Sequence, residues 1–166
     1  HFGHTERRYP SKDRTLAARY ARAIAHFRKP DLEMGLTLID ALIKERPRDP
    51  FFREVKAQFL FENGRAADSL PVYQAGVDLL PQSGLFRRSL AQVQLEMDDP
   101  ALLEPAAKNL RLALREEADS PFTWRLLAIA YGRNGQVAES SLALAEEAML
   151  KGEKSAAAHH AGRAES

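Results

Sequence analysis

Cysteine is absent from the 166-residue chain. Its absence excludes disulfides, thiolate zinc sites and thiol catalysis, and fits a cytosolic or a periplasmic location equally well. No run of about 18 apolar residues occurs, so we expect no membrane span. The formal net charge is only +1, which gives no overall field that would favour nucleic acid or lipid. The remaining composition, 45% hydrophobic and 28% charged, is that of a soluble chain able to bury a core.

Two N-terminal features are also missing. The chain opens with "HFGHTERRYPSKD", which has no initiating Met and no basic start followed by an apolar stretch. A secretory signal peptide needs a basic start and an apolar stretch after it. We therefore expect the chain to be a piece of a longer protein.

Alternation with period two, the mark of a half-buried strand, is absent as well. Apolar residues instead recur at i, i+3, i+4 and i+7 in segments of about a dozen residues, the period of an amphipathic helix. Short breaks separate these segments: "RKPD", "RPRDP", "ENGR", "LPQSG", "MDDP", "EADSP", "RNGQ" and "KGEK". The pattern predicts an all-α chain.

The helical segments repeat. When the stretch from Pro50 is placed over the stretch from Pro121, Ala57 matches Ala128, Gly64 matches Gly135 and Ser69 matches Ser140. Residues 16–49 and 50–83 are each 34 residues long, which is the tetratricopeptide repeat (TPR) period. Trp124, Leu127, Ala128 and Tyr131 match the first-helix signature of this repeat, with Ala in place of Gly. The predicted fold is a right-handed TPR superhelix of about four antiparallel helix pairs plus a C-terminal helix.

The expected organisation follows from this register. Residues 1–14 form a linker or extended segment, and residues 15–166 a TPR domain with repeats near 16–49, 50–83, 84–120 and 121–152 and a terminal helix at 153–165. Small residues, among them Ala57 with Ser69 and Ala128 with Ser140, are expected to let the two helices of a pair approach closely.

Caps and turns can be assigned in the same register. Asp49, Ser83 and Ser120 are candidate N-caps. Gly64 and Gly135 are candidate turn residues, with Pro30 in the same place in the first repeat. The third repeat carries three extra residues around "DDPALLEP". The first repeat is atypical, with Arg19, Arg22 and His26 at positions that should be apolar, as is common in a terminal repeat.

No catalytic or metal-binding pattern is present. His1 and His4 are close in sequence and His159 and His160 are adjacent, but no Asp or Glu completes a ligand set and there is no H-E-x-x-H motif. No Ser/His/Asp signature or phosphate loop appears, and the basic spots "ERR" and "FRR" are too small for a nucleic-acid footprint. We predict a chain that is not an enzyme and needs no metal or cofactor.

The first helices of the repeats are expected to line a concave, peptide-binding groove. Aromatic anchors beside adaptable amides suit an extended peptide or an unfolded segment, although any one aromatic can instead complete the packing between repeats. Phe51 and Phe122 are the positions where that alternative is strongest. In this register the face consists of Ala17, Tyr20, Ile24, Phe27, Phe51, Glu54, Gln58, Phe61, Leu85, Arg88, Gln92, Leu95, Phe122, Arg125 and Ile129. The predicted site residues among them are Tyr20, Ile24, Phe27, Glu54, Gln58, Phe61, Arg88, Gln92, Leu95, Arg125 and Ile129.

Charged positions on this face leave two interpretations open. Arg88 and Arg125 can grip a carboxylate of a ligand or pair with a neighbouring Glu. The Lys and Asn residues with which TPR co-chaperones hold the C-terminal carboxylate of heat-shock proteins are missing, because Tyr20, Ile24, Glu54 and Gln58 occupy their positions.

Several stretches also resemble a particular family. "ARYARAIA", "DPFFREVKAQ" and "AIAYGRNG", the last followed by a helix rich in Ser and Ala, look like the C-terminal TPR half of bacterial HtpX-related zinc metallopeptidases of the β-barrel assembly-enhancing type. The resemblance covers nearly all of residues 9–165. In that family an upstream domain carries the H-E-x-x-H zinc site, none of whose residues exists in this chain.

The resemblance implies a function. The chain would be the non-catalytic half of a periplasmic metalloprotease with duties in protein quality control. It would bind substrates or assembly partners and contact its own upstream protease domain. The alternative is a free-standing TPR adaptor or scaffold in the cytoplasm or periplasm.

Overall fold

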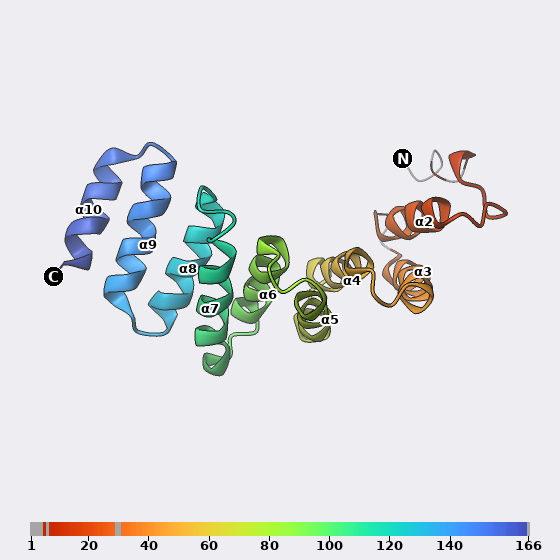
Figure 1. Cartoon of the computed structure of the whole chain (residues 1–166), viewed down its shortest axis with the longest axis horizontal. Helices are drawn as coiled ribbons and strands as arrows, with labels where there is room; N and C mark the ends of the chain where they lie inside the picture. The colour runs from red at the N-terminus through yellow and green to blue at the C-terminus, as the bar shows by residue number, and fades with distance from the viewer. Residues whose placement is uncertain (1–4, 6, 29–30, 166) are drawn as a thin grey trace. The chain divides into compact units, whose positions relative to one another are not determined.

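The computed structural model describes residues 5, 7–28 and 31–165, and within these ranges every regular element is helical. Figure 1 labels the helices in chain order. They are α2 (Leu16–Arg28), α3 (Leu32–Glu45), α4 (Pro50–Glu62), α5 (Ala66–Leu79), α6 (Gly84–Glu96), the 3-10 helix η1 (Pro100–Leu102), α7 (Leu103–Ala113), α8 (Pro121–Arg133), α9 (Val137–Leu150) and α10 (Lys154–Ala164). The all-α prediction is confirmed. The three extra residues of the third repeat fall at η1, which precedes α7.

Contacts divide the chain into two compact units, His1–Leu79 and Leu80–Ser166. In the first unit α2 pairs with α3, α4 pairs with α5, and α3 packs against α4. In the second unit α6 pairs with α7, α8 pairs with α9, α7 packs against α8, and α10 lies along α9. Each unit is therefore built from antiparallel helix pairs. The predicted extents of the repeats and of a single domain over residues 15–166 stay predictions.

Side-chain caps fix where three first helices begin. Asp49 accepts a hydrogen bond from the backbone N–H of Phe51, Ser83 from that of Phe86, and Ser120 from that of Thr123. Each bond satisfies a donor that the first helical turn leaves without an intrahelical partner. Pro50 and Pro121 follow two of these caps, at a position where a missing N–H costs nothing.

The turns within the pairs need a left-handed backbone conformation. Gly64 and Gly135 follow α4 and α8 and have φ of 73° and 77°, a region that glycine enters without steric cost. Asp98, at the equivalent position after α6, has φ of 52°. The third pair thus makes the same turn with a residue that has a side chain. Pro30, assigned to this position in the first pair, lies outside the described residues.

The two helices of a pair approach closely where small residues meet. The Ser69 hydroxyl donates to the Ala57 carbonyl oxygen at 2.8 Å, and the Ser140 hydroxyl donates to the Ala128 carbonyl oxygen at the same distance. In the first pair, a Cβ on Gly35 would lie 3.4 Å from the Ala23 carbonyl oxygen. The register that aligned these small residues therefore corresponds to a structural crossing point of the helices.

Each unit has its own apolar core. The first is built around Ile39, Leu42, Phe52 and Phe59. The second is built around Leu110, Leu126, Leu127, Tyr131 and their neighbours, with Trp124 packed against it from the edge. The TPR signature residues Leu127, Ala128 and Tyr131 are all buried, so their spacing marks the face of α8 that enters the core.

The polar residues of α2 hold neighbouring segments. The Arg22 guanidinium donates to the carbonyl oxygens of Pro10 and Asp13, each at 2.9 Å. Arg19 pairs with Glu45 of α3. Arg22 therefore fastens residues 10–13 onto α2, while the apolar stripe of α2 faces the first core.

Candidate functional site

The aromatic residues predicted on α2 contact buried aromatic residues of α4 that lie outside the predicted set. The Tyr20 and Phe52 ring centroids are 5.9 Å apart, and Phe27 stacks on Phe59 at 4.0 Å with an interplanar angle of 16°. Because Phe52 and Phe59 are buried, one side of the Tyr20 ring and one side of the Phe27 ring pack against the core. Ile24 packs against the same core.

Three other apolar residues at one equivalent position turn to solvent. Phe51, Leu85 and Phe122 are the second residues of α4, α6 and α8, and they are 59%, 38% and 49% exposed. The sequence left open that Phe51 and Phe122 pack between repeats. In the structure about half of each side chain is uncovered. These two residues stand outside the predicted site set, yet they are its most accessible aromatic neighbours.

Glu54 and Gln58 lie on α4, one turn apart. The Gln58 amide donates to the Glu62 carboxylate at 2.6 Å, whereas Glu54 accepts no hydrogen bond from any described residue. Burial raises the pKa of the Glu54 carboxyl, and the negative charge of Glu62 raises it further. Burial and the charge of Glu54 likewise raise the pKa of Tyr20. Glu54 is therefore a carboxylate with no hydrogen-bond donor or ion-pair partner among the described residues.

Both arginines of the predicted face are paired within the second unit. Arg88 of α6 binds Glu117, and Arg125 of α8 donates to the Glu147 carboxylate of α9 at 2.5 Å. Lys151 donates to the other Glu147 oxygen. Burial raises the pKa of Glu147, but the hydrogen bonds from Arg125 and Lys151 outweigh it and lower the pKa overall. Of the two interpretations, the structure favours pairing with a neighbouring Glu.

The other predicted positions differ in accessibility. Leu95 is only 6% exposed and belongs to the second core, so it offers little surface to a partner. Ile129 packs against the same core. Gln92 and Phe61 are half-buried. The accessible positions are therefore Gln58 and Phe51 in the first unit, Leu85, Phe122 and the exposed but paired Arg125 in the second, and the edges of the half-buried residues.

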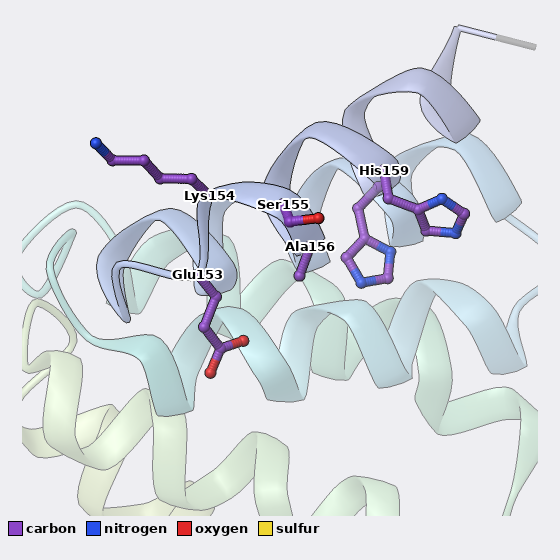
Figure 2. A pocket seen from close by; sticks show the side chains of 6 residues that line it. Glu153, Lys154, Ser155, Ala156 and His159 are labelled. Carbon is purple, nitrogen blue, oxygen red and sulfur yellow. The ribbon is translucent and has the colours of Figure 1, made fainter.

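The C-terminal histidines border a shallow hollow at the beginning of α10. Figure 2 shows its lining, in which Glu153 and Lys154 point in different directions. The His159 and His160 rings lie edge to face, with centroids 5.6 Å apart. Among the described residues, no group of three or more His, Cys, Asp or Glu side chains is placed to hold a metal ion. His1 and His4 lie outside the described residues.

Membrane insertion has no candidate among the described helices. None of them is both long enough and apolar enough to cross a bilayer.

Comparison with known proteins gives a fold. No protein-family model matches the chain, and no curated protein matches it in sequence. Among solved structures it is similar to MamA residues 41 to the end from Desulfovibrio magneticus RS-1, with a TM-score of 0.78 and 16% identity over 92% of this chain and 85% of that one. Another MamA crystal structure matches with a TM-score of 0.72 and 14% identity, over 86% of this chain and 91% of that one.

A third similar structure is YrrB, described as a TPR protein with an unusual peptide-binding site. Its TM-score is 0.74 and its identity 10%, over 95% of this chain and 80% of that one. At such identities the likeness concerns the fold alone. Together with the helix pairs described above, it confirms the predicted fold class: the chain has the all-α fold of TPR proteins.

Proposed function

We propose that the chain is a protein-interaction module that binds segments of other proteins on the first-helix faces of its two units. One observation carries the proposal. Phe51, Leu85 and Phe122 occupy the same position in three first helices, and all three leave a large apolar surface in water. A monomer gains nothing by exposing such residues in register, whereas a binding surface uses them as anchors. A peptide-binding role, like that named for YrrB, agrees with this arrangement.

The polar groups nearby give the ligand some chemical character. Gln58 and Gln92 offer amides that can donate to or accept from a peptide backbone. The uncompensated Glu54 carboxylate in the first unit favours a basic side chain in the part of the ligand that reaches it. A segment with apolar and polar residues and a Lys or Arg therefore fits the first-helix face of the first unit. A segment with apolar and polar residues fits that of the second unit.

The proposal is tested by selecting peptides from a displayed random library on the whole chain and measuring their affinity in solution. Replacing Leu85 and Phe122 by Ala in one variant should weaken the selected peptides by roughly tenfold or more, because large side chains at the centre of an interface carry much of its energy. A Phe51→Ala variant probes the first unit in the same way.

Met149 supplies the matched control. It lies on α9, a second helix, and is 63% exposed. Met149→Ala removes a comparable apolar surface from another face and should leave the affinity unchanged. If the Leu85 and Phe122 variant binds the selected peptides as well as the unaltered chain does, the first-helix faces are not the binding surface.

We further propose that the module belongs to a periplasmic zinc metallopeptidase, as its non-catalytic half. The support is the resemblance of "ARYARAIA", "DPFFREVKAQ" and "AIAYGRNG" to the TPR half of the HtpX-related family. The natural protein should then be much larger than this chain on a blot raised against it, and should contain zinc after purification. A zinc-free protein of this size would instead be a free-standing adaptor.

A further inference from the structure

The second unit contains an apolar cavity that the first-helix faces do not use. It has a volume of about 260 Å³ and lies between α7, α8 and α9. Leu127 and Ala143 form its buried floor, and Trp124 and Leu142 form its walls. Ligand pockets for drug-sized molecules are usually larger than this. The cavity is therefore of a size for one or two side chains of a protein.

The walls are held in place by contacts within the unit. The Trp124 indole N–H donates to the Ala118 carbonyl oxygen at 2.9 Å, which fixes the ring. The Arg111 guanidinium donates to the Tyr131 hydroxyl at 3.1 Å and to Glu104 at 2.9 Å. Leu142 is the exception, since it is 54% exposed. A preformed pocket with one uncovered apolar wall loses little entropy when a ligand fills it.

The equivalent junction in the first unit is polar. In the repeat register, Lys56 stands where the second unit has Leu127, and Asp40 stands where it has Arg111. The Lys56 ammonium binds the Asp40 carboxylate at 2.7 Å. The hollow there, of about 410 Å³, is lined by this pair and by Glu33, Arg65 and Asp68. The apolar pocket is thus a property of the second unit and not of helix-pair packing in general.

On the α7 side of the pocket, two cations have no carboxylate partner among the described residues. Lys108 and Arg115 flank Arg111 at helical spacing, so the three lie along one side of α7 and its C-terminal end. The side chains of Lys108 and Arg115 are exposed, and within the part of the chain that the structure describes they have no ion pair or hydrogen bond. Of the carboxylates nearby, Glu104 binds Arg111, Glu117 binds Arg88, and Glu116 accepts from the Gly84 backbone. None of these three carboxylates lines the pocket; the acidic residue of its lining is Glu139 of α9.

We propose that this pocket receives one large apolar side chain, of the size of Leu, Met or Phe, from an acidic segment of a partner protein. The apolar side chain fills the space between Trp124 and Leu142. Carboxylates beside it in the ligand lie against Lys108 and Arg115. The site depends on the proposed function only in that its ligand is a protein, and neither Leu85 nor Phe51 takes part in it.

The test uses Trp124, the single Trp of the chain, as a reporter inside the site. The probe is a synthetic peptide with a central Leu between Glu residues in a Gly and Ser background, titrated into the whole chain. A saturable shift of the Trp emission is expected. Replacing the central Leu of the probe by Ala should weaken the response by roughly tenfold or more, and replacing its Glu residues by Lys should weaken it as well.

Leu142→Glu places a charge on the exposed wall and should abolish the response. Met149→Glu, on the same helix and outside the pocket, is its matched control and should respond normally; circular dichroism verifies that both variants fold. Leu85→Ala should also respond normally, which separates this site from the first-helix faces. Equal binding of the Leu and Ala probes, binding of the Lys probe as tight as that of the Glu probe, or a full response from Leu142→Glu would each overturn the proposal. So would a Trp shift that follows dimerisation without any peptide, because a second copy would then be the occupant.

Discussion

Glu54 combines three conditions that disfavour a charged carboxylate. Its carboxyl is partly buried, another carboxylate lies nearby, and no described residue donates a hydrogen bond to it. Burial is the larger reason for its raised pKa and the charge of Glu62 is the smaller one. Ionising this residue in the folded protein therefore costs more than ionising it in the unfolded chain.

The sign of the pH dependence follows. Because the folded state holds the proton more tightly than the unfolded state, the residue stabilises the fold below the ordinary Glu pKa. That contribution is lost as the pH rises through the folded-state value. Glu54→Gln, which keeps the shape and removes the charge, should raise Tm at neutral pH. The difference should fade below about pH 4, where the wild-type carboxyl is protonated in both states.

Thermal melts of the wild-type protein and of Glu54→Gln, from below about pH 4 to neutral pH, measure how the Tm difference changes. Glu146→Gln is the control, because Glu146 is an exposed residue of α9 and its replacement should change Tm little at any pH. A Tm difference for Glu54→Gln that stays constant from acid to neutral pH would contradict the explanation.

At the scale of the element, the turn after α6 differs from its counterparts. Gly64 and Gly135 occupy the left-handed position after α4 and α8, and Asp98 occupies it after α6. A side chain makes this conformation unfavourable, although Asp tolerates it better than most residues. The 3.9 Å ion pair of Asp98 with Arg133 is too exposed to offset much of that cost.

Replacing Asp98 should rank three residues by their tolerance of positive φ. Asp98→Gly relieves the turn and should stabilise the protein by about 0.5 kcal/mol, since the gain exceeds the entropy that glycine adds to the unfolded chain. Asp98→Ala should destabilise it by a similar amount. Urea unfolding of the three proteins gives the order, and a Gly variant less stable than the Ala variant would show that the turn is not strained.

The sequence predicted the caps and crossing points of the helices because the groups that form them lie close together in the chain or recur with the repeat. The caps at Asp49, Ser83 and Ser120 act on backbone groups two or three residues away, so a linear pattern contains both partners. The crossing points at Ser69 and Ser140 join residues 12 apart, and the repeat register identifies them because both pairs recur at the same positions. The unusual turn at Asp98 could have been found in this way too, because the register places it opposite Gly64 and Gly135.

The candidate site was harder to predict because its partners are distant in sequence. Glu117 and Glu147 lie 29 and 22 residues from the arginines that they bind, and several other carboxylates were equally available to pair. Whether Phe51 and Phe122 turn to the core or to water depends on how the neighbouring helix lies. The apolar pocket left a weak signal, the change from Lys56 to Leu127 at one register position, but its walls come from three helices.

At the scale of the whole molecule, some large apolar residues are buried in the cores and others are exposed on the first helices. Leu127 and Phe59 hold the cores, and their truncation to Ala should each cost roughly 2–5 kcal/mol. Phe51, Leu85 and Phe122 are partly exposed and lie outside both cores, so a triple replacement by Ser should keep the helical circular dichroism and stay within about 1.5 kcal/mol of the wild-type stability. The same triple variant should bind less of a dye specific for exposed apolar surface. A large loss of stability would show that these three side chains serve the fold, in which case their shared exposure would no longer argue for a binding surface.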